Sequence, residues 1–180
     1  KNMTFKKEFW ALLSIFLLPI GLGTLFFYLN PSYFSQNTVN YGELITPVIV
    51  TEKSDLDIKG DASLQGVWTL AYVTDSCDSL CNQAVADVKT IRTLINMDMR
   101  RIQRMLIAED GSAPLEGDEN LVLASINNEK LSSQLASFPE NSIFLIDPIG
   151  NFMLYYNPVD INIKFVLKDL KRLLKYSRIG

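Results

Sequence analysis

Histidine is absent from all 180 residues of the sequence, and cysteine occurs only twice. Without histidine the chain can form neither a Ser-His-Asp triad nor a histidine-containing zinc or haem site. Two cysteines exclude a small fold held by several disulfides, and 9 glycines with 7 prolines exclude a collagen-like repeat. The net charge of −3 provides no global basic field, so we expect no nucleic-acid partner.

Apolar residues make up 48% of the sequence, and many of them lie near its beginning. Residues 9–29 contain no charged side chain, and about 20 such residues cross the hydrocarbon core of a bilayer as a helix. A core helix of a globular domain would not be apolar on every side over this length. Trp10 and Tyr28 lie where the interfacial aromatic belts would fall. We therefore predict a transmembrane helix over about residues 9–29, with the lipid bilayer as its partner.

Positive charge flanks only the N-terminal side of this segment. Lys1, Lys6 and Lys7 precede it, whereas the first positive residue after it is Lys53. The positive-inside rule then predicts a cytoplasmic N-terminus and an extracytoplasmic remainder. The alternative is a cleaved signal peptide, but the run exceeds the usual apolar region of about 7–15 residues and no A-x-A-like site follows it. We interpret residues 1–29 as the cytoplasmic N-terminus and an uncleaved single-pass anchor.

Two unlike regions follow the anchor. Residues 30–61 are rich in Asn, Ser and Tyr and carry one apolar run at 44–50, interrupted by Pro47, which predicts a lead-in segment with one edge strand. Residues 62–180 alternate between strand and helix patterns, which predicts an α/β domain. In it we expect strands at 67–73, 102–108, 121–124, 143–146 and 152–156, and helices at 81–97, 128–135 and 160–176, the last with Asp160 as its N-cap. A strand that leads directly into a cysteine-bearing helix, followed by a closing hairpin and a last helix, is a thioredoxin-like arrangement.

The two cysteines carry the candidate chemistry. Cys77 and Cys81 are separated by three residues, which predicts one helical turn between them and a Cα–Cα distance of about 6 Å. This spacing suits a disulfide, and it also suits two thiolates that hold one soft ion such as Cu(I). A helix N-terminus lowers the pKa of a thiol, whereas the nearby Asp75 and Asp78 raise it, and the net direction stays open.

An inert structural disulfide is the alternative to reactive cysteines. An oxidising compartment permits such a bridge. However, a disulfide between Cys77 and Cys81 closes a very short loop and removes little entropy from the unfolded chain. We therefore favour a redox or metal-binding role for this pair.

Two further segments are strongly charged. The acidic loop at 109–119 lacks the alternating carboxylates and the glycine of a calcium loop, so we expect a solvated excursion. The last helix is basic, and we interpret its charges as a solvated face, with contact to anionic lipid or to an acidic partner as the alternative. Its basic residues are Lys164, Lys168, Lys171, Arg172, Lys175 and Arg178.

Two stretches resemble the Sco/SenC family of membrane-anchored copper chaperones. They are residues 64–73 (LQGVWTLAYV) followed by Cys77-x-x-x-Cys81, and residues 144–151 (FLIDPIGN). The resemblance implies a thioredoxin-like fold and a role in cytochrome c oxidase assembly, by copper delivery or by reduction of the cysteines of the CuA site. It also implies that Cys77 and Cys81 match the two sulfur ligands of the family. The resemblance further implies that this is a bacterial inner-membrane protein with a periplasmic domain.

The chain departs from the pattern of that family at two places. The family flanks its cysteines with prolines, where this chain has Asp78 and Asn82, and its third copper ligand is a histidine absent from residues 138–142. A Cys-Cys-His copper site is therefore excluded. Residues 40–45 (NYGELI) and 177–180 (SRIG) resemble a histidine-lacking proteobacterial branch that accompanies oxidase and haem A assembly.

Three functions remain after this comparison of patterns. The first is an assembly factor of the respiratory chain that acts through thiol–disulfide exchange or Cu(I) handling at Cys77 and Cys81, with oxidase subunits or other assembly factors as partners. The second is a redox-inert thioredoxin-like interaction module or accessory subunit of a membrane complex. The third is a general extracytoplasmic thiol–disulfide oxidoreductase, which the three-residue spacing disfavours because such enzymes use C-x-x-C. We favour the first, with Cu(I) as the one metal that the pair could hold.

Overall fold

The structure, a computed structural model, describes residues 2–30, 39–114, 118–157, 159 and 161–179. The chain divides into two compact units, Lys1–Val39 and Asn40–Gly180.

The first unit is built on one long apolar helix, α1 (Asn2–Leu29). Its segment Lys6–Leu29 has a mean hydropathy of 2.2, and none of its most apolar window is buried by other parts of the protein. At about 1.5 Å per residue this segment is about 36 Å long, enough to cross a hydrocarbon core of about 30 Å. The helix includes Pro19, which spanning helices tolerate. The unit is therefore a helix that could span a membrane.

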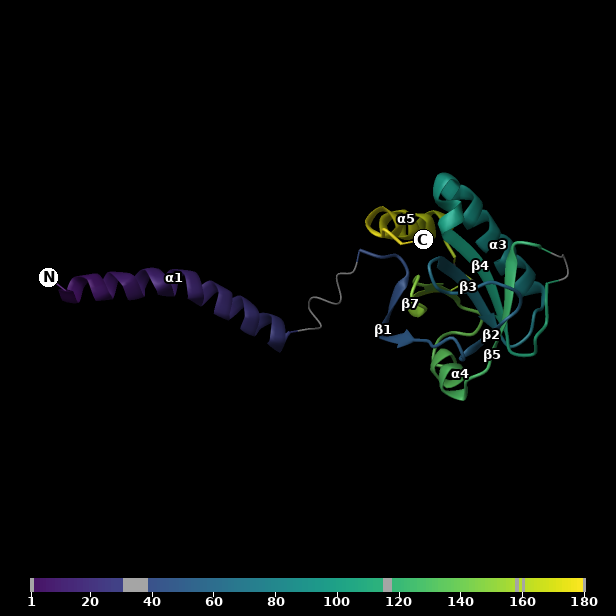
Figure 1. Ribbon diagram of the computed structural model, residues 1–180, viewed down its shortest axis with the longest axis horizontal. Coiled ribbons are helices and arrows are strands. Elements are labelled where there is room, and N and C mark those ends of the chain that lie inside the picture. Colours follow the sequence, from purple (N-terminus) through teal and green to yellow (C-terminus); the bar gives the residue numbers. More distant parts are fainter. Residues whose placement is uncertain (1, 31–38, 115–117, 158, 160, 180) are drawn as a thin grey trace. The chain divides into compact units, whose positions relative to one another are not determined.

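The second unit is built on a seven-stranded mixed sheet (Figure 1). The strands, in chain order, are β1 (Glu43–Val50), β2 (Leu56–Ile58), β3 (Trp68–Thr74), β4 (Ile102–Ala108), β5 (Leu121–Ile126), β6 (Ile143–Ile146) and β7 (Asn151–Tyr156). In space their order is β1-β7-β6-β3-β4-β5-β2. Strand β3 runs parallel to β4 and β4 parallel to β5, whereas all other neighbours are antiparallel.

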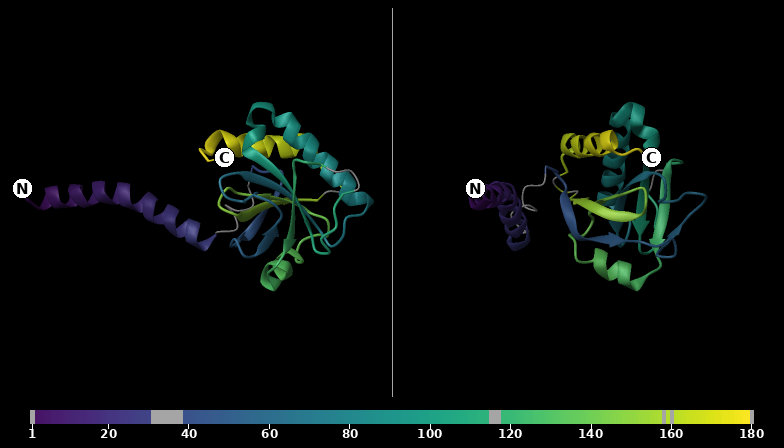
Figure 2. Two further views of the ribbon diagram at one scale, coloured as in Figure 1. Left: turned by 45° about the vertical axis from the view of Figure 1, so that its right-hand side comes forward. Right: turned by 60° about the vertical axis from the view of Figure 1, so that its left-hand side comes forward.

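Helices cover both faces of this sheet (Figure 2). Helices α3 (Ser79–Ile95) and α5 (Ile163–Tyr176) lie on one face, and α4 (Glu129–Leu135) lies on the other. A 3-10 turn, η1 (Asn96–Arg101), connects α3 to β4.

The sheet packs an apolar cluster on each of its two faces, and the central strand β3 contributes to both. Leu70 and Tyr72 belong to the apolar cluster under α3 and α5, whereas Ala71 between them belongs to the cluster under α4. Successive side chains of a strand point to opposite faces, so a strand buried on both faces needs a continuous apolar run. The cysteines follow directly where this strand ends, which fixes the start of α3 against the sheet.

The predicted α/β thioredoxin-like fold with a preceding apolar helix is confirmed. Strands β4 and β6 have the limits expected from the sequence, and β1 is the predicted edge strand, with Pro47 inside it. An edge strand accommodates a proline because one side of its backbone needs no ladder partner.

Several limits differ from the expectation. β2 was not expected, and because β1 and β2 pair with β7 and β5, the second unit begins at Asn40, earlier than residue 62. The last helix begins at Ile163, with Asn162 as its N-cap, whereas the expected cap, Asp160, lies outside the described residues. Asn and Asp cap helices about equally well, so the pattern could not distinguish these two positions.

Candidate functional site

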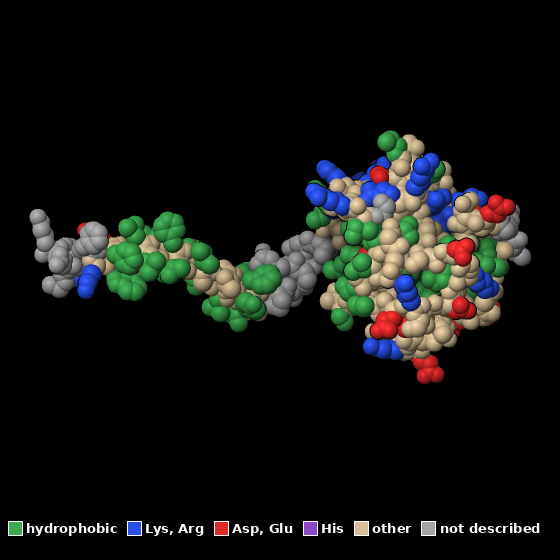
Figure 3. All heavy atoms as spheres, in the orientation of Figure 1, with side chains coloured by type: hydrophobic (Ala, Val, Ile, Leu, Met, Phe, Trp, Pro, Cys, Tyr) green, Lys and Arg blue, Asp and Glu red, His purple; other side chains and the backbone are tan. Residues whose placement is uncertain are grey.

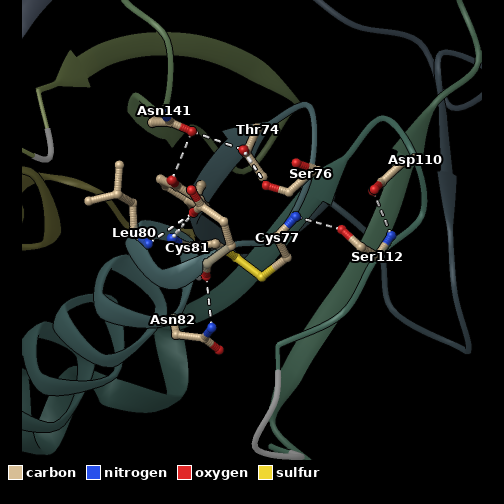
Figure 4. Close-up of a disulfide and its surroundings, with 11 residues drawn as sticks. Thr74, Ser76, Cys77, Leu80, Cys81, Asn82, Asp110, Ser112 and Asn141 are labelled. Carbon is tan, nitrogen blue, oxygen red and sulfur yellow. Dashed lines mark hydrogen bonds between the residues drawn. A yellow bond between two sulfur atoms is a disulfide. The ribbon is translucent and has the colours of Figure 1, made fainter.

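Cys77 and Cys81 form a disulfide at the junction of β3 and α3, with their Cα atoms 5.0 Å apart (Figure 4). Cys81 lies in the first turn of α3 and is fully buried, whereas Cys77 is half-buried. The expectation that one helical turn separates the two cysteines is wrong, because α3 begins at Ser79 and Cys77 precedes its N-cap. One sulfur therefore belongs to the loop and the other to the core.

Asp78, between the cysteines, is the N-cap of α3. Its carboxylate accepts hydrogen bonds from the backbone N–H groups of Leu80 (2.9 Å) and Cys81 (3.1 Å). The side-chain amide of Asn82 donates to the Asp78 carbonyl at 2.7 Å. Asp just before a helix is a usual cap signal, so the capping role of Asp78, as well as its repelling charge, follows from the sequence. Two helix N–H groups that could stabilise a thiolate are thus engaged by a carboxylate.

Ser112, from the loop after β4, holds the other side of the cysteine segment. The Cys77 backbone N–H donates to the Ser112 hydroxyl at 2.6 Å, and the Ser112 backbone N–H donates to Asp110 at 2.8 Å. Hydrogen bonds from the side chain and backbone of Ser112 lower the pKa of Asp110. A segment expected to be a solvated excursion therefore supports the site. No local signal pointed to Ser112, because it lies 35 residues from Cys77.

Asn141 supports the end of β3 from the loop before β6. Its side-chain oxygen accepts a hydrogen bond from the Tyr72 hydroxyl at 3.0 Å and lies 2.9 Å from the Thr74 hydroxyl, which is 2.8 Å from the Ser76 carbonyl. Burial raises the pKa of Tyr72. Asn141 has a φ of 63°, a left-handed conformation that Asn tolerates better than most residues. Its amide lies in the segment 138–142, where the resemblance would place a histidine.

A cavity of about 320 Å³ adjoins the cysteine segment, between that segment, α4 and the loop before β6. Ser76 and Asp78 form part of its wall, so it opens beside the disulfide. Its wall is mainly polar with two aromatic rings, and its charged side chains are all acidic. These residues are Asp75, Asp78, Glu109 and Glu140, with Phe138 and Phe144 as the rings. The charge that lines the cavity is therefore negative.

The donor set limits which metal the site could hold. After reduction, Cys77 and Cys81 would offer two thiolates, and two soft sulfur donors suit Cu(I). Within the described residues, no group of three or more Cys, Asp or Glu side chains is placed to bind one ion. The Asn141 oxygen is a hard donor already engaged by Tyr72. Among the residues that the structure describes, the donor set therefore fits a Cu(I) site made of the two sulfurs.

A buried ion pair holds the far end of the loop that contains Ser112. The guanidinium of Arg104, only 2% exposed, donates two hydrogen bonds to Asp118 at 2.7 and 2.8 Å, and Lys89 lies 3.5 Å from the same carboxylate. The hydrogen bonds from Arg104 hold the pKa of Asp118 far below its ordinary value. Asp118 is thus an exception to the expected solvated loop, because the buried guanidinium of Arg104 needs a counter-charge.

Known structures share this fold. The apo Sco1 protein of Thermus thermophilus is 14% identical, with a TM-score of 0.54 over 76% of this chain and 98% of that one. Copper-bound yeast Sco1 is 11% identical, with a TM-score of 0.52 over 78% and 96% of the two chains. BsSco, described as a Sco-family cytochrome c oxidase assembly protein with a disulfide switch, is 12% identical, with a TM-score of 0.50 over 78% and 98%. At these identities the likeness establishes the fold alone.

No curated protein matches the sequence. A family model does match, over residues 68–177, which is more than half of the chain and includes both cysteines. The chain therefore belongs to the family described as "transmembrane-like, thioredoxin-like, C-terminal domain".

Proposed function

We propose that this protein is a membrane-anchored thiol–disulfide exchange factor that assists the assembly of cytochrome c oxidase. The observation that carries the proposal is the Cys77–Cys81 disulfide at the end of β3, with one half-buried and one fully buried sulfur. A disulfide that closes so short a loop contributes little stability. Its position at a helix N-terminus beside a cavity is therefore better explained by exchange chemistry.

The exchange proceeds in two balanced steps. In the reduced protein the Cys77 thiolate attacks one sulfur of a partner disulfide, and the other partner sulfur leaves as a thiolate. The Cys81 thiolate then attacks the Cys77 sulfur, which forms the Cys77–Cys81 bond and releases the second partner thiolate. Two electrons pass to the partner, which becomes a dithiol. A dithiol donor on the same side of the membrane restores the reduced pair.

The different burial of the two sulfurs supports different roles for them. A partner can reach Cys77, whereas Cys81 is inaccessible from outside and acts only on a sulfur already bound to Cys77. The N–H groups of the first turn of α3 favour a thiolate, and the carboxylate of Asp78 opposes it. We infer that Asp78 moderates the reactivity of Cys77 while it caps the helix.

The oxidase as target is supported by the resemblance to the Sco/SenC family and by the fold shared with Sco proteins. The lysines that precede the apolar segment 9–29 support a cytoplasmic N-terminus, and with it a periplasmic site in a bacterial inner membrane. We assign residues 1–29 to the anchor and residues 40–180 to the thioredoxin-like domain. The complete lack of histidine supports a histidine-lacking proteobacterial branch of Sco/SenC-like proteins.

Cu(I) handling is the second candidate function, because copper-bound Sco structures share the fold and the reduced pair offers two soft donors. Here Cu(I) is cargo, carried by Cys77 and Cys81 and passed to the CuA site. The position of Asn141 in the segment that bears histidine in the family favours thiol exchange over copper delivery.

Cysteine substitutions in cells test the proposal. Cys77→Ser should abolish exchange with a CuA-domain disulfide, Cys81→Ser should trap a mixed disulfide, and each should lower oxidase activity. Ser79→Ala, an exposed position in the same turn that keeps both cysteines, is the matched control. Full oxidase activity in the Cys77→Ser/Cys81→Ser double variant, beside a strain that lacks the protein, would remove the thiol mechanism and favour the inert interaction module. Normal oxidase activity together with disulfides that stay unreduced in other proteins would favour the general oxidoreductase.

A further inference from the structure

The exposed face of α5 and its C-terminal extension carry positive charge only. Six basic side chains between residues 161 and 179 are exposed, whereas the single acidic one described there, Asp169, is 1% exposed. Basic atoms gather over this part of the domain surface in Figure 3. The six are Lys164, Lys168, Lys171, Arg172, Lys175 and Arg178.

The neighbouring 3-10 turn η1 adds to this charge. Arg100 is exposed, and Arg101 donates hydrogen bonds to the carbonyls of Leu174 and Ser177 at the end of α5. The one acidic side chain of η1, Asp98, pairs with Arg101 at 3.2 Å. The turn therefore contributes net positive charge to the same surface.

The buried Asp169 of α5 binds the first residues of the second unit. Its carboxylate accepts hydrogen bonds from the backbone N–H groups of Tyr41 (2.9 Å) and Gly42 (2.9 Å) and from the Tyr156 hydroxyl (3.1 Å). Since both N–H groups come from the segment that follows α1 in sequence, the chain enters the domain directly on α5.

Aromatic contacts on the exposed side of α5 also hold Tyr41 against this helix. The Tyr41 ring stacks on that of Phe165, with centroids 4.1 Å apart, and the Lys168 ammonium lies 5.2 Å from the centre of the Tyr41 ring. Tyr41, Phe165 and Tyr176, the last residue of α5, all remain exposed. Aromatic rings among basic side chains are the composition found at membrane–water interfaces.

The length of the connection limits how far this surface can lie from the anchor. The chain between Leu29 and Asn40 can extend over at most about 40 Å, at up to about 3.6 Å per residue. If α1 crosses a bilayer, α5 is therefore held within that reach of the headgroups, where anionic phospholipids attract basic side chains.

We propose that the basic face of α5 docks the thioredoxin-like domain on the anionic phospholipid surface of the bilayer that holds α1. Lysine and arginine side chains donate to lipid phosphates, and Tyr41, Phe165 and Tyr176 lie at headgroup level. This docking rests on α1 as the anchor and is independent of the thiol chemistry at Cys77.

The test measures the accessibility of lysines in the full chain. The protein is reconstituted into nanodiscs of zwitterionic lipid alone or with anionic phosphatidylglycerol, and its lysines are labelled with a water-soluble amine reagent and quantified by mass spectrometry. In anionic discs, α5 lysines should be labelled about threefold or more slowly than in zwitterionic discs. Labelling of the exposed Lys53 and Lys59 should not change, and about 1 M salt should abolish the protection.

Charge variants with matched controls complete the test. Lys164→Gln/Lys171→Gln/Lys175→Gln should remove the protection of the remaining Lys168. The control, Lys53→Gln/Lys59→Gln/Lys130→Gln, removes the same charge from exposed positions elsewhere and should retain it. Unchanged melting of both variants in detergent confirms that they fold. Equal labelling of α5 in both kinds of disc would overturn the proposal, and protection that occurs only in native membranes would instead indicate an acidic protein partner.

Discussion

The backbone nitrogen of Cys81 lies 3.1 Å from a carboxylate oxygen of Asp78. The residue that caps α3 is thus also the negative charge nearest to the sulfur pair in sequence, and it uses N–H groups that would otherwise face a thiolate. The Asp78 side chain therefore stabilises the helix and at the same time disfavours the Cys77 thiolate. This relationship makes the site testable without removal of a cysteine.

Asp78→Asn should separate the two effects. Asn caps helices about as well as Asp, so the free energy of unfolding should hardly change, whereas the loss of a like charge should lower the pKa of the reduced Cys77 thiol. Exchange at neutral pH should become about two- to threefold faster. The measurement is the pH dependence of alkylation of the reduced full-length protein.

Asp57→Asn, at an exposed position on β2, is the control for net charge and should leave the rate unchanged. Asp78→Ala removes both cap and charge, and it should also cost about 1 kcal/mol of stability. An alkylation profile identical for Asp78→Asn and the unmodified protein would show that this carboxylate does not moderate Cys77.

The ion pair of Arg104 and Asp118 predicts a pH dependence of stability. Because the folded-state pKa of Asp118 lies below its unfolded value, the pair stabilises the fold fully above about pH 4, and this stabilisation is lost as the pH falls toward the folded-state pKa. Asp118→Asn should destabilise the domain at pH 7 by about 3 kcal/mol, since it leaves the buried guanidinium without its counter-charge.

Urea unfolding of the full chain in detergent, at pH 7 and pH 3, measures this effect. The difference between the unmodified protein and Asp118→Asn should shrink at the lower pH. Asp61→Asn, at an exposed position, should show no difference at either pH. If the two proteins differed in their free energy of unfolding by the same amount at pH 7 and at pH 3, the pH dependence predicted for Asp118 would be contradicted.

Asp169 should be essential for attachment of residues 40–42 to α5. Asp169→Ala leaves the N–H groups of Tyr41 and Gly42 and the Tyr156 hydroxyl without their acceptor, and we expect a loss of about 3 kcal/mol. Asp169→Asn keeps one acceptor oxygen and should cost less. Thermal unfolding followed by circular dichroism distinguishes the three proteins, and equal stability of Asp169→Ala and the unmodified protein would contradict this arrangement.

The core of the fold could be predicted because its strands are long, apolar and continuous. Strand β4 is buried over nearly its whole length, and β3 likewise, so each gives a clear run in the sequence. β2 has three residues, of which only Leu56 is buried, and so short a segment has no pattern to detect. The first unit was predictable for the same reason as β4, since its apolar run exceeds 20 residues.

The site was only partly predictable because its support is not local. The closeness of Cys77 and Cys81 follows from their spacing, but the contacts of the site with Ser112 and Asn141 join residues 35 and 67 positions apart. Such contacts depend on the parallel pairing of β3 with β4 and on the loop before β6. Asp78 differs, since its capping role depends only on its position just before the helix and could be predicted from the sequence.

The orientation of the anchor predicts which reagents reach the cysteines. A membrane-impermeant thiol reagent should label Cys77 in intact, reduced spheroplasts, because the lysines that precede the apolar segment 9–29 favour the cytoplasmic side. Cys81, fully buried, should react only after denaturation. Labelling of Cys77 only after membrane lysis would contradict the predicted orientation and exclude a periplasmic function.

The copper chemistry provides the last prediction. The reduced protein should bind at most one Cu(I), because two thiolates satisfy a soft ion of low coordination number, and it should form no stable Cu(II) complex in the absence of nitrogen ligands. Its Cu(I) affinity should be lower than that of a Sco protein that retains the histidine. Competition with a Cu(I) chelator measures the affinity, with Cys77→Ser as the variant that leaves one sulfur and Ser76→Ala as the neighbouring control. An affinity equal to that of the three-ligand relative would require a further donor from this chain, and the Asn141 loop would be the first segment to search for it, since it lies beside Thr74 at the end of the strand that leads to the cysteines.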